Sequence, residues 1–134
     1  MVTTVDKKNS QFSDAVRELT GTGFEIVNES GGCAEVLTPM LDEDGDHIGF
    51  YVRRIAGGYT FSDCGEFFSS LWIRGLDARP NGEMAGKVDA LLRGTNAVRN
   101  GSDIVSRSVY YNHHIAEAVD EFARTLEMLY TTAW

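Results

Sequence analysis

Residues 41–66 decide the fold, and they run LDEDGDHIGFYVRRIAGGYTFSDCGE. An acidic turn around Gly45 comes first, and apolar and polar residues then alternate over residues 47–53, the pattern of a half-buried β-strand. Gly57-Gly58 predicts a tight turn into a second strand at residues 59–61. The stretch therefore predicts an antiparallel pair of strands that leads into a helix.

Two further strands are predicted before this stretch. The first strand is predicted at residues 24–27. Gly31-Gly32 turns the chain back into the second strand at residues 33–41, where Ala34, Val36 and Met40 alternate with Glu35, Leu37 and Leu41. Pro39 cannot donate a hydrogen bond to a neighbouring strand, so this strand is expected at an edge of the sheet or with a bulge near its end. Four antiparallel strands that neighbour one another in chain order are the simplest topology.

Helices are predicted on both sides of the strands, where apolar residues recur at helical spacing. The four segments are residues 12–19, 67–72, 84–92 and 115–129. Asp63 and Glu66 predict a capping box that opens the second helix. Asn81 and Asn112 are the expected caps of the third and fourth. Trp72 in the second helix is expected in the core, with a homodimer contact as the alternative.

A second, small β-hairpin is predicted around Asn100-Gly101, a pair that favours a tight two-residue turn. The two short strands of this hairpin are predicted at residues 97–99 and 103–105. With 134 residues, 43% of them hydrophobic, the chain has the size and composition of one domain, residues 1–134. The predicted fold is α+β: an antiparallel four-stranded meander flanked by helices, with the second hairpin and a long C-terminal helix.

The charge of the chain argues against one large class of partner. The net charge is −8, and residues 1–66 carry 12 acidic and five basic side chains, against eight and seven in residues 67–134. No cluster of Lys and Arg is larger than a pair, so direct binding to nucleic acid is not expected. No apolar run is long enough to cross a membrane and no signal peptide is recognisable, which predicts a cytosolic protein in its own cell or in a host cell.

The acidic turn has the composition of a metal site without the required pattern. Asp42, Asp44 and Asp46 alternate as calcium ligands do, but the Gly and Glu that an EF-hand loop needs at its sixth and twelfth positions are absent. A looser site formed by Asp42, Asp46, Asp63 and Glu66 is disfavoured, because the turn and the start of the helix are expected at opposite ends of their strands. No metal and no cofactor are predicted.

Other enzyme classes lack their motifs. A nuclease of the restriction type needs a lysine on the sheet, and the three lysines all lie outside the predicted strands. Cys64 lies at the start of a predicted helix, where the pKa of a thiol falls, but no nucleophile signature surrounds it. His113-His114 would bind a metal only with ligands from elsewhere in the chain. The chain is therefore predicted to have no catalytic residues and not to be an enzyme.

Several short motifs together resemble a known family. They are LTPMLD at 37–42, GDHI at 45–48, YV at 51–52, GY at 58–59 and SDCGE at 62–66. With the later hairpin and the last helix, residues 20–130 are similar to an uncharacterised domain family found in bacterial and prophage genes. The resemblance implies an α+β fold and a setting among mobile genetic elements, with no assigned reaction. In that family the position of Cys64 more usually holds a small polar or acidic residue, which argues against a catalytic thiol.

The function predicted from these observations is protein binding by a small acidic protein of phage or prophage type. The expected contact is the acidic turn, and its residues are Asp42, Glu43, Asp44 and Asp46. The partner is expected to have a basic surface, for example a host defence complex that handles nucleic acid and is inhibited by an anti-CRISPR or anti-restriction protein. The alternative is a metal-dependent hydrolase that uses Asp46, Asp63 and Glu66.

Overall fold

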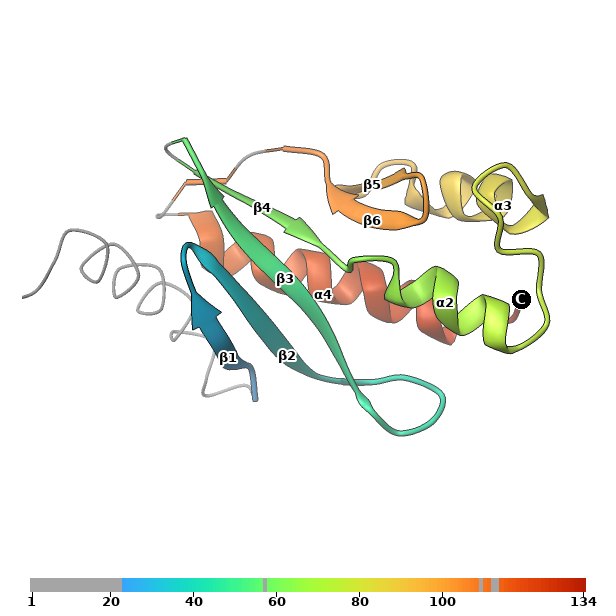
Figure 1. Ribbon diagram of the computed structural model, residues 1–134, viewed down its shortest axis with the longest axis horizontal. Helices are drawn as coiled ribbons and strands as arrows, with labels where there is room; N and C mark the ends of the chain where they lie inside the picture. Colours follow the sequence, from blue (N-terminus) through green and yellow to red (C-terminus); the bar gives the residue numbers. More distant parts are fainter. Residues whose placement is uncertain (1–22, 57, 109, 112–113) are drawn as a thin grey trace, which may run out of the picture.

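Figure 1 shows the computed structural model, which describes residues 23–56, 58–108, 110–111 and 114–134. The predicted helix at residues 12–19 and the predicted cap at Asn112 lie outside the described residues. Within the described part of the chain, a twisted sheet is covered by a long helix, and two shorter helices lie beside it (Figure 1).

The described residues form one six-stranded antiparallel sheet in the order β1-β2-β3-β4-β6-β5. Its strands are β1 (Glu25–Ser30), β2 (Cys33–Leu41), β3 (His47–Ile55), β4 (Gly58–Ser62), β5 (Ala97–Asn100) and β6 (Asp103–Ser106). The first four follow chain order, which confirms the predicted meander and the α+β fold. The predicted second hairpin forms as β5 and β6, and it extends the same sheet through β6.

The core lies between the sheet and the last helix. The helices are α2 (Glu66–Ile73), α3 (Glu83–Leu92) and α4 (Ile115–Thr131). The ring of Phe122 on α4 contacts Phe50 and Phe61, with ring centroids 4.9 and 5.4 Å away. Alternate side chains of β3 from Ile48 to Val52 are buried, as the sequence pattern predicts. None of these helices, in the part of the chain that the structure describes, has the length and apolarity needed to cross a membrane.

The position of Pro39 is explained by a bulge. β2 pairs with β1 on one side and with β3 on the other, so it is not an edge strand. The register between β2 and β3 shifts between Leu37 and Leu41, the interval that contains Pro39. Within it the buried hydroxyl of Thr38 accepts a hydrogen bond from the backbone N–H of Met40 at 3.1 Å. The bulge therefore accommodates the residue that has no N–H to donate.

The start of α3 differs from the prediction. Gly82, not Asn81, is the N-cap residue, and no side chain caps it directly. The carbonyl of Asp77 accepts from the N–H of Met84 at 3.3 Å, and its carboxylate binds Arg79 through two contacts of 2.8 Å. The preceding loop thus stabilises the helix start, which is why the local cap signal at Asn81 was wrong.

The expectation that Trp72 is buried is also wrong, because its side chain is 63% exposed. α2 buries Phe67, Phe68 and Leu71, which form a stripe along one side of the helix. Successive residues of a helix are about 100° apart, so Trp72 lies at the flank of that stripe and Ile73 points away from it. Ile73 is 84% exposed. The end of α2 therefore presents large apolar side chains to solvent.

A buried carboxylate, Asp63, connects three segments of the fold. It is 1% exposed, and its Oδ1 accepts from the N–H groups of Gly65 at 3.0 Å and Ile104 at 2.8 Å. Its Oδ2 accepts from the N–H of Phe67 in the first turn of α2 at 3.0 Å. Burial raises the pKa of the Asp63 carboxyl above its ordinary value, and the three N–H donors oppose that shift because they favour the anion.

The predicted capping box between Asp63 and Glu66 is wrong, because Gly65 is the N-cap residue of α2 and no side chain caps it directly. In a capping box the Glu side chain would accept from the backbone N–H of Asp63. That N–H instead donates to the carbonyl of Ile104 on β6 at 2.9 Å. Asp63 does bind an N–H of the helix start, but its other partners join the hairpin to the meander. Its role is therefore tertiary as well as local.

We expect Asp63→Ala to lower the free energy of unfolding by about 3 kcal/mol, because buried N–H groups on two elements lose their acceptor. A lost helix cap alone would cost about 1 kcal/mol. Urea denaturation measures the difference. The matched control is Ser62→Ala, which removes one exposed acceptor for the N–H of Cys64 and should cost well under the loss at Asp63. Equal losses in the two variants would contradict the tertiary role of Asp63.

Candidate functional site

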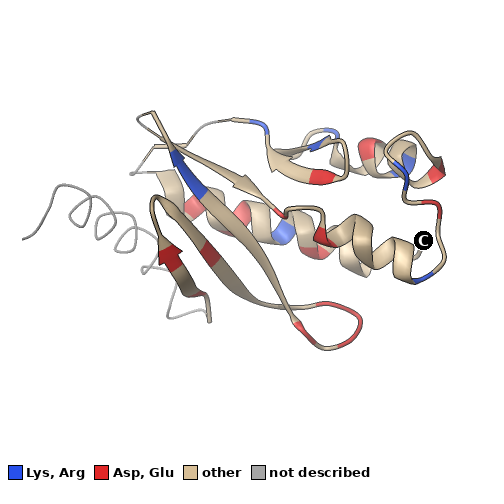
Figure 2. Cartoon of the chain, in the orientation of Figure 1, with Lys and Arg blue, Asp and Glu red and all other residues tan. Residues whose placement is uncertain are grey.

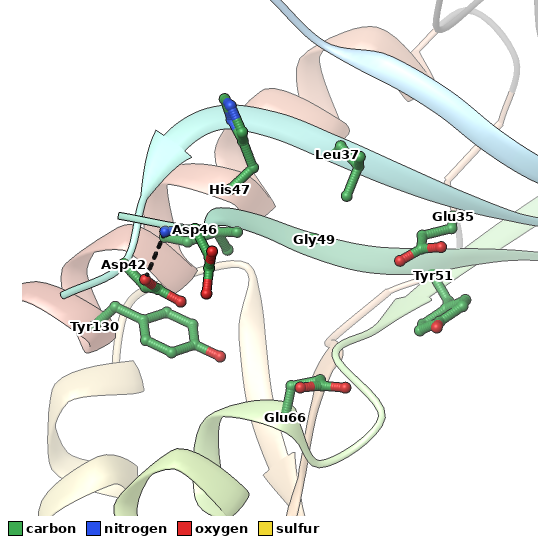
Figure 3. Close-up of a pocket in the computed structure, with 10 residues that line it drawn as sticks. Glu35, Leu37, Asp42, Asp46, His47, Gly49, Tyr51, Glu66 and Tyr130 are labelled. Carbon is green, nitrogen blue, oxygen red and sulfur yellow. Dashed lines mark hydrogen bonds between the residues drawn. The ribbon is translucent and has the colours of Figure 1, made fainter. Parts of the chain in front are cut away.

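A pocket of about 240 Å³ lies beside the first half of β3. It is lined by four carboxylates and two tyrosine hydroxyls, contributed by Glu35, Asp42, Asp46, Glu66, Tyr51 and Tyr130. Figure 3 shows these side chains around one hollow, with Glu66 from α2 and Tyr130 from α4 facing the β2–β3 strand pair. His47 also borders the pocket, with Nδ1 2.7 Å from the carbonyl oxygen of Thr38, and among the described lining residues none is Lys or Arg.

The sheet register explains how the pocket arises. β4 pairs with β3 only from Gly58 opposite Ile55 to Ser62 opposite Tyr51, so the first half of β3 extends beyond β4. After β4 the chain turns into α2, which places Glu66 beside the half of β3 that has no β4 partner. The space between the strand and the helix is the pocket.

The antiparallel return of β4 also corrects a sequence expectation. The acidic turn and the start of α2 were expected at opposite ends of their strands. β4 runs back towards the turn that precedes β3, so the two lie at the same end, and Asp42, Asp46 and Glu66 line one pocket. The expectation was wrong because it ignored that a hairpin returns the chain to where it began.

The acidic turn is built around Asp42. Its Oδ1 accepts from the N–H groups of Asp44 at 2.9 Å and Asp46 at 3.0 Å, and its own N–H donates to the carbonyl of Asp46 at 2.9 Å. Gly45 has a φ of +83°, a left-handed conformation that favours glycine. Figure 2 shows acidic residues along this turn between β2 and β3. The geometry of the turn depends on the carboxylate of Asp42 and on Gly45, and it does not require the other carboxylates.

The four predicted partner-binding residues are divided by the structure. Asp42 and Asp46 line the pocket. Glu43 forms an ion pair with Arg74 at the end of α2, with Oε1 and Nη2 3.5 Å apart and both side chains substantially exposed. Asp44 is exposed on the turn. The turn thus contributes two carboxylates to the pocket, and a third is paired with a basic residue at the end of α2.

The two tyrosines report the negative field in the pocket. The carboxylate of Glu35, directly opposite Tyr51 on β2, raises the pKa of the Tyr51 hydroxyl, and partial burial adds to this shift. Burial raises the pKa of Tyr130 far above its ordinary value, and the carboxylates of Asp63, Glu66 and Asp42 raise it further. Both hydroxyls therefore remain protonated at neutral pH.

The residues proposed for a hydrolase are not assembled. Asp46 and Glu66 line the pocket, but Asp63 does not, and both of its carboxylate oxygens accept backbone N–H bonds. In the described ranges, no group of three His, Cys, Asp or Glu side chains is arranged to hold a metal ion. Cys64 is exposed at the turn before α2. The arrangement suits the binding of a positively charged group by carboxylates.

Three pocket residues were not found from the sequence. Glu35 and Tyr51 lie on the polar face of their strands, and they meet because the β2–β3 register pairs them directly. A register prediction for that hairpin could have found this pair. Tyr130 comes from the last turns of α4, far along the chain, and packs its ring against Phe67 with centroids 5.1 Å apart. No local pattern connects Tyr130 to the acidic turn.

Comparison with protein families gave one match. The model of a family described as a domain of unknown function, DUF1828, matches residues 38–105, just over half of the chain. The match spans the acidic turn, β3, β4, α2 and α3 and includes Glu66, whereas Glu35 and Tyr130 lie outside it. It confirms the predicted resemblance to an uncharacterised domain family. Searches of curated proteins and of solved structures found no match.

We expect the combined change Asp42→Asn, Glu43→Gln and Asp44→Asn to leave the free energy of unfolding within about 0.5 kcal/mol. Asparagine keeps the acceptor oxygen that binds the N–H groups of Asp44 and Asp46, and fewer like charges repel one another. Asp42→Ala should instead cost about 1 kcal/mol, because it removes that acceptor. Chemical denaturation compares the two, and a strongly destabilised triple variant would show that the turn needs its charges.

We expect Glu35→Gln to lower the pKa of Tyr51 towards the ordinary value of 10.0, because the glutamate carboxylate is the largest cause of the raised pKa. An alkaline NMR titration of the tyrosine ring carbons measures it. Glu117→Gln, in the first turn of α4, is the matched control and should leave Tyr51 unchanged. The same shift in both variants would mean that net charge, not the Glu35–Tyr51 pair, sets the pKa.

Proposed function

We propose that this chain, which belongs to the DUF1828 family of domains of unknown function, is a protein-binding module whose acidic pocket accepts an arginine or lysine side chain. The observation that carries the proposal is the pocket lining, which combines four carboxylates with two tyrosines and, among the described residues, no Lys or Arg. A cation that enters this pocket relieves the repulsion between the carboxylates.

The size of the pocket favours one side chain over a whole small molecule. Sites for drug-sized ligands have volumes of about 300–1,000 Å³, and this pocket has about 240 Å³. A guanidinium can bind two carboxylate oxygens at once, and it also stacks on aromatic rings such as those of Tyr51 and Tyr130. We therefore propose arginine as the preferred occupant.

The charge of the whole chain supports a partner with a basic surface. The net charge is −8, and Asp42 and Asp46 of the acidic turn line the pocket itself. Proteins that handle nucleic acid expose Arg and Lys to bind phosphates. The partner we propose first is a cytosolic host defence complex that handles nucleic acid. The protein would inhibit that complex, as anti-CRISPR and anti-restriction proteins of phages do. Attraction between opposite charges would speed the association.

The direct test uses N-acetyl-arginine amide as the probe and N-acetyl-citrulline amide, which has the same shape without the charge, as the control. We expect arginine to shift the backbone NMR signals of Glu35, Tyr51 and Glu66, with a dissociation constant in about the millimolar range for a single ion-pair site. Citrulline should shift none of them. Added salt should weaken the binding, because the attraction is electrostatic.

Matched variants separate the pocket from the general charge of the protein. Glu66→Gln should weaken arginine binding several-fold, and Glu121→Gln, an exposed residue of α4 outside the pocket, should leave it unchanged. Equal effects of the two substitutions, or NMR shifts spread over the whole surface, would mean that arginine binds by non-specific attraction to the net charge and not in the pocket. No shift with arginine at low salt would end the proposal.

A further inference from the structure

Three large apolar side chains are exposed at the end of β2 and the end of α2, two segments that an ion pair joins. Leu41, Trp72 and Ile73 are 48%, 63% and 84% exposed, and Leu41 directly precedes the turn. The ion pair between Glu43 and Arg74 places the turn against the last residues of α2. Apolar side chains of this size concentrated at one end of a domain are typical of a binding surface.

A groove runs along the far flank of α2, between this helix and the β5–β6 hairpin. It has a volume of about 250 Å³ and is lined by Gly65, Phe68, Ser69, Trp72, Ala78 and Ser102. Its base is apolar, because Phe68 and Ala78 are buried members of the core. The groove thus has room for an apolar side chain beside the exposed ring of Trp72.

Helix geometry places the groove and the acidic pocket on either side of the exposed face of α2. Glu66 lines the pocket and Trp72 lines the groove. At about 100° a residue, these two positions are about 120° apart around the helix, with Ser69 and Ile73 between them. A segment that crosses α2 would therefore meet the acidic pocket, then Ile73, then the groove.

The charge around this face is negative. The first two basic residues that follow α2 in the chain are each paired with a carboxylate, Arg74 with Glu43 and Arg79 with Asp77. Glu66 is the first residue of α2, and the carboxylate of Asp103 lies close to Gly65 at the groove. A second copy of this chain, with its net charge of −8, would bring like charges together. Charge complementarity therefore favours a basic partner over self-association.

We infer that the outer face of α2 binds a basic amphipathic segment of a partner protein, with an arginine in the acidic pocket and an apolar side chain in the groove beside Trp72. This inference rests on the proposed function, since the arginine occupies the same pocket. A helix with its side chains is about 10 Å wide, a distance that about three extended residues span. The two anchor residues of the segment are therefore about three positions apart.

The test selects binders from a library of random short peptides, with the full chain as bait. Enriched peptides should carry an arginine and a large apolar residue about three positions apart. One such peptide is then labelled, and its dissociation constant is measured against variants of the protein. Trp72→Ala and Glu66→Gln should each raise that constant about tenfold, the effect expected for one lost anchor. Val98→Ser is the control, because Val98 is an exposed apolar residue on β5 that lines neither the pocket nor the groove.

The peptide itself distinguishes this inference from the proposed function. Citrulline in place of its arginine tests the pocket, and serine in place of its apolar residue tests the groove. Loss with citrulline alone would overturn the inference and leave the proposed function. Loss with serine alone would overturn both the arginine pocket and the two-anchor segment. The same selection is repeated with the Glu66→Gln variant as bait, and equal enrichment on both baits would also overturn the inference. So would a dimer of the free protein that the substitution Ile73→Asp dissociates, because a second copy would then cover this face.

Discussion

The arrangement of this protein depends on a carboxylate that is removed from water. Asp63 binds backbone N–H groups of Gly65, Phe67 and Ile104, and so joins the end of β4, the start of α2 and the strand β6. The ladder between β4 and β6 contains one residue pair, Ser62 with Val105. Backbone pairing alone would therefore hold the hairpin weakly, and the position of α2, with the acidic pocket on one flank and the groove on the other, follows from these side-chain bonds.

The carboxylates of the acidic pocket lower the stability of the free protein. They come from β2, the following turn and α2, and they repel one another in the free protein. The turn itself needs only the carboxylate of Asp42 and the left-handed backbone of Gly45. Features that folding does not require and that weaken the free protein are expected at binding sites, where a ligand of opposite charge compensates for them.

The sequence predicted those parts of the fold that local patterns determine. Alternation along β3, the paired glycines after it and the pair Asn100-Gly101 identified the meander and the hairpin, because a strand face and a tight turn each depend on neighbouring residues. The bonds of Asp63 join residues 41 positions apart. The pocket likewise joins β2 with the end of α4, and the exposure of Trp72 depends on where α2 ends on the surface. No local pattern encodes such distances.

The single residue pair between β4 and β6 is a narrow seam in the backbone pairing of the sheet. The residues on both sides of it contribute to one hydrophobic core, the meander and α4 on one side and β5, β6 and α3 on the other. Local opening of a protein follows such seams, because few bonds must break there. Ser102 in the hairpin and Trp72 on α2 line the same groove from its two sides. An opening along the seam would therefore raise amide exchange in the hairpin and widen the groove at the same time.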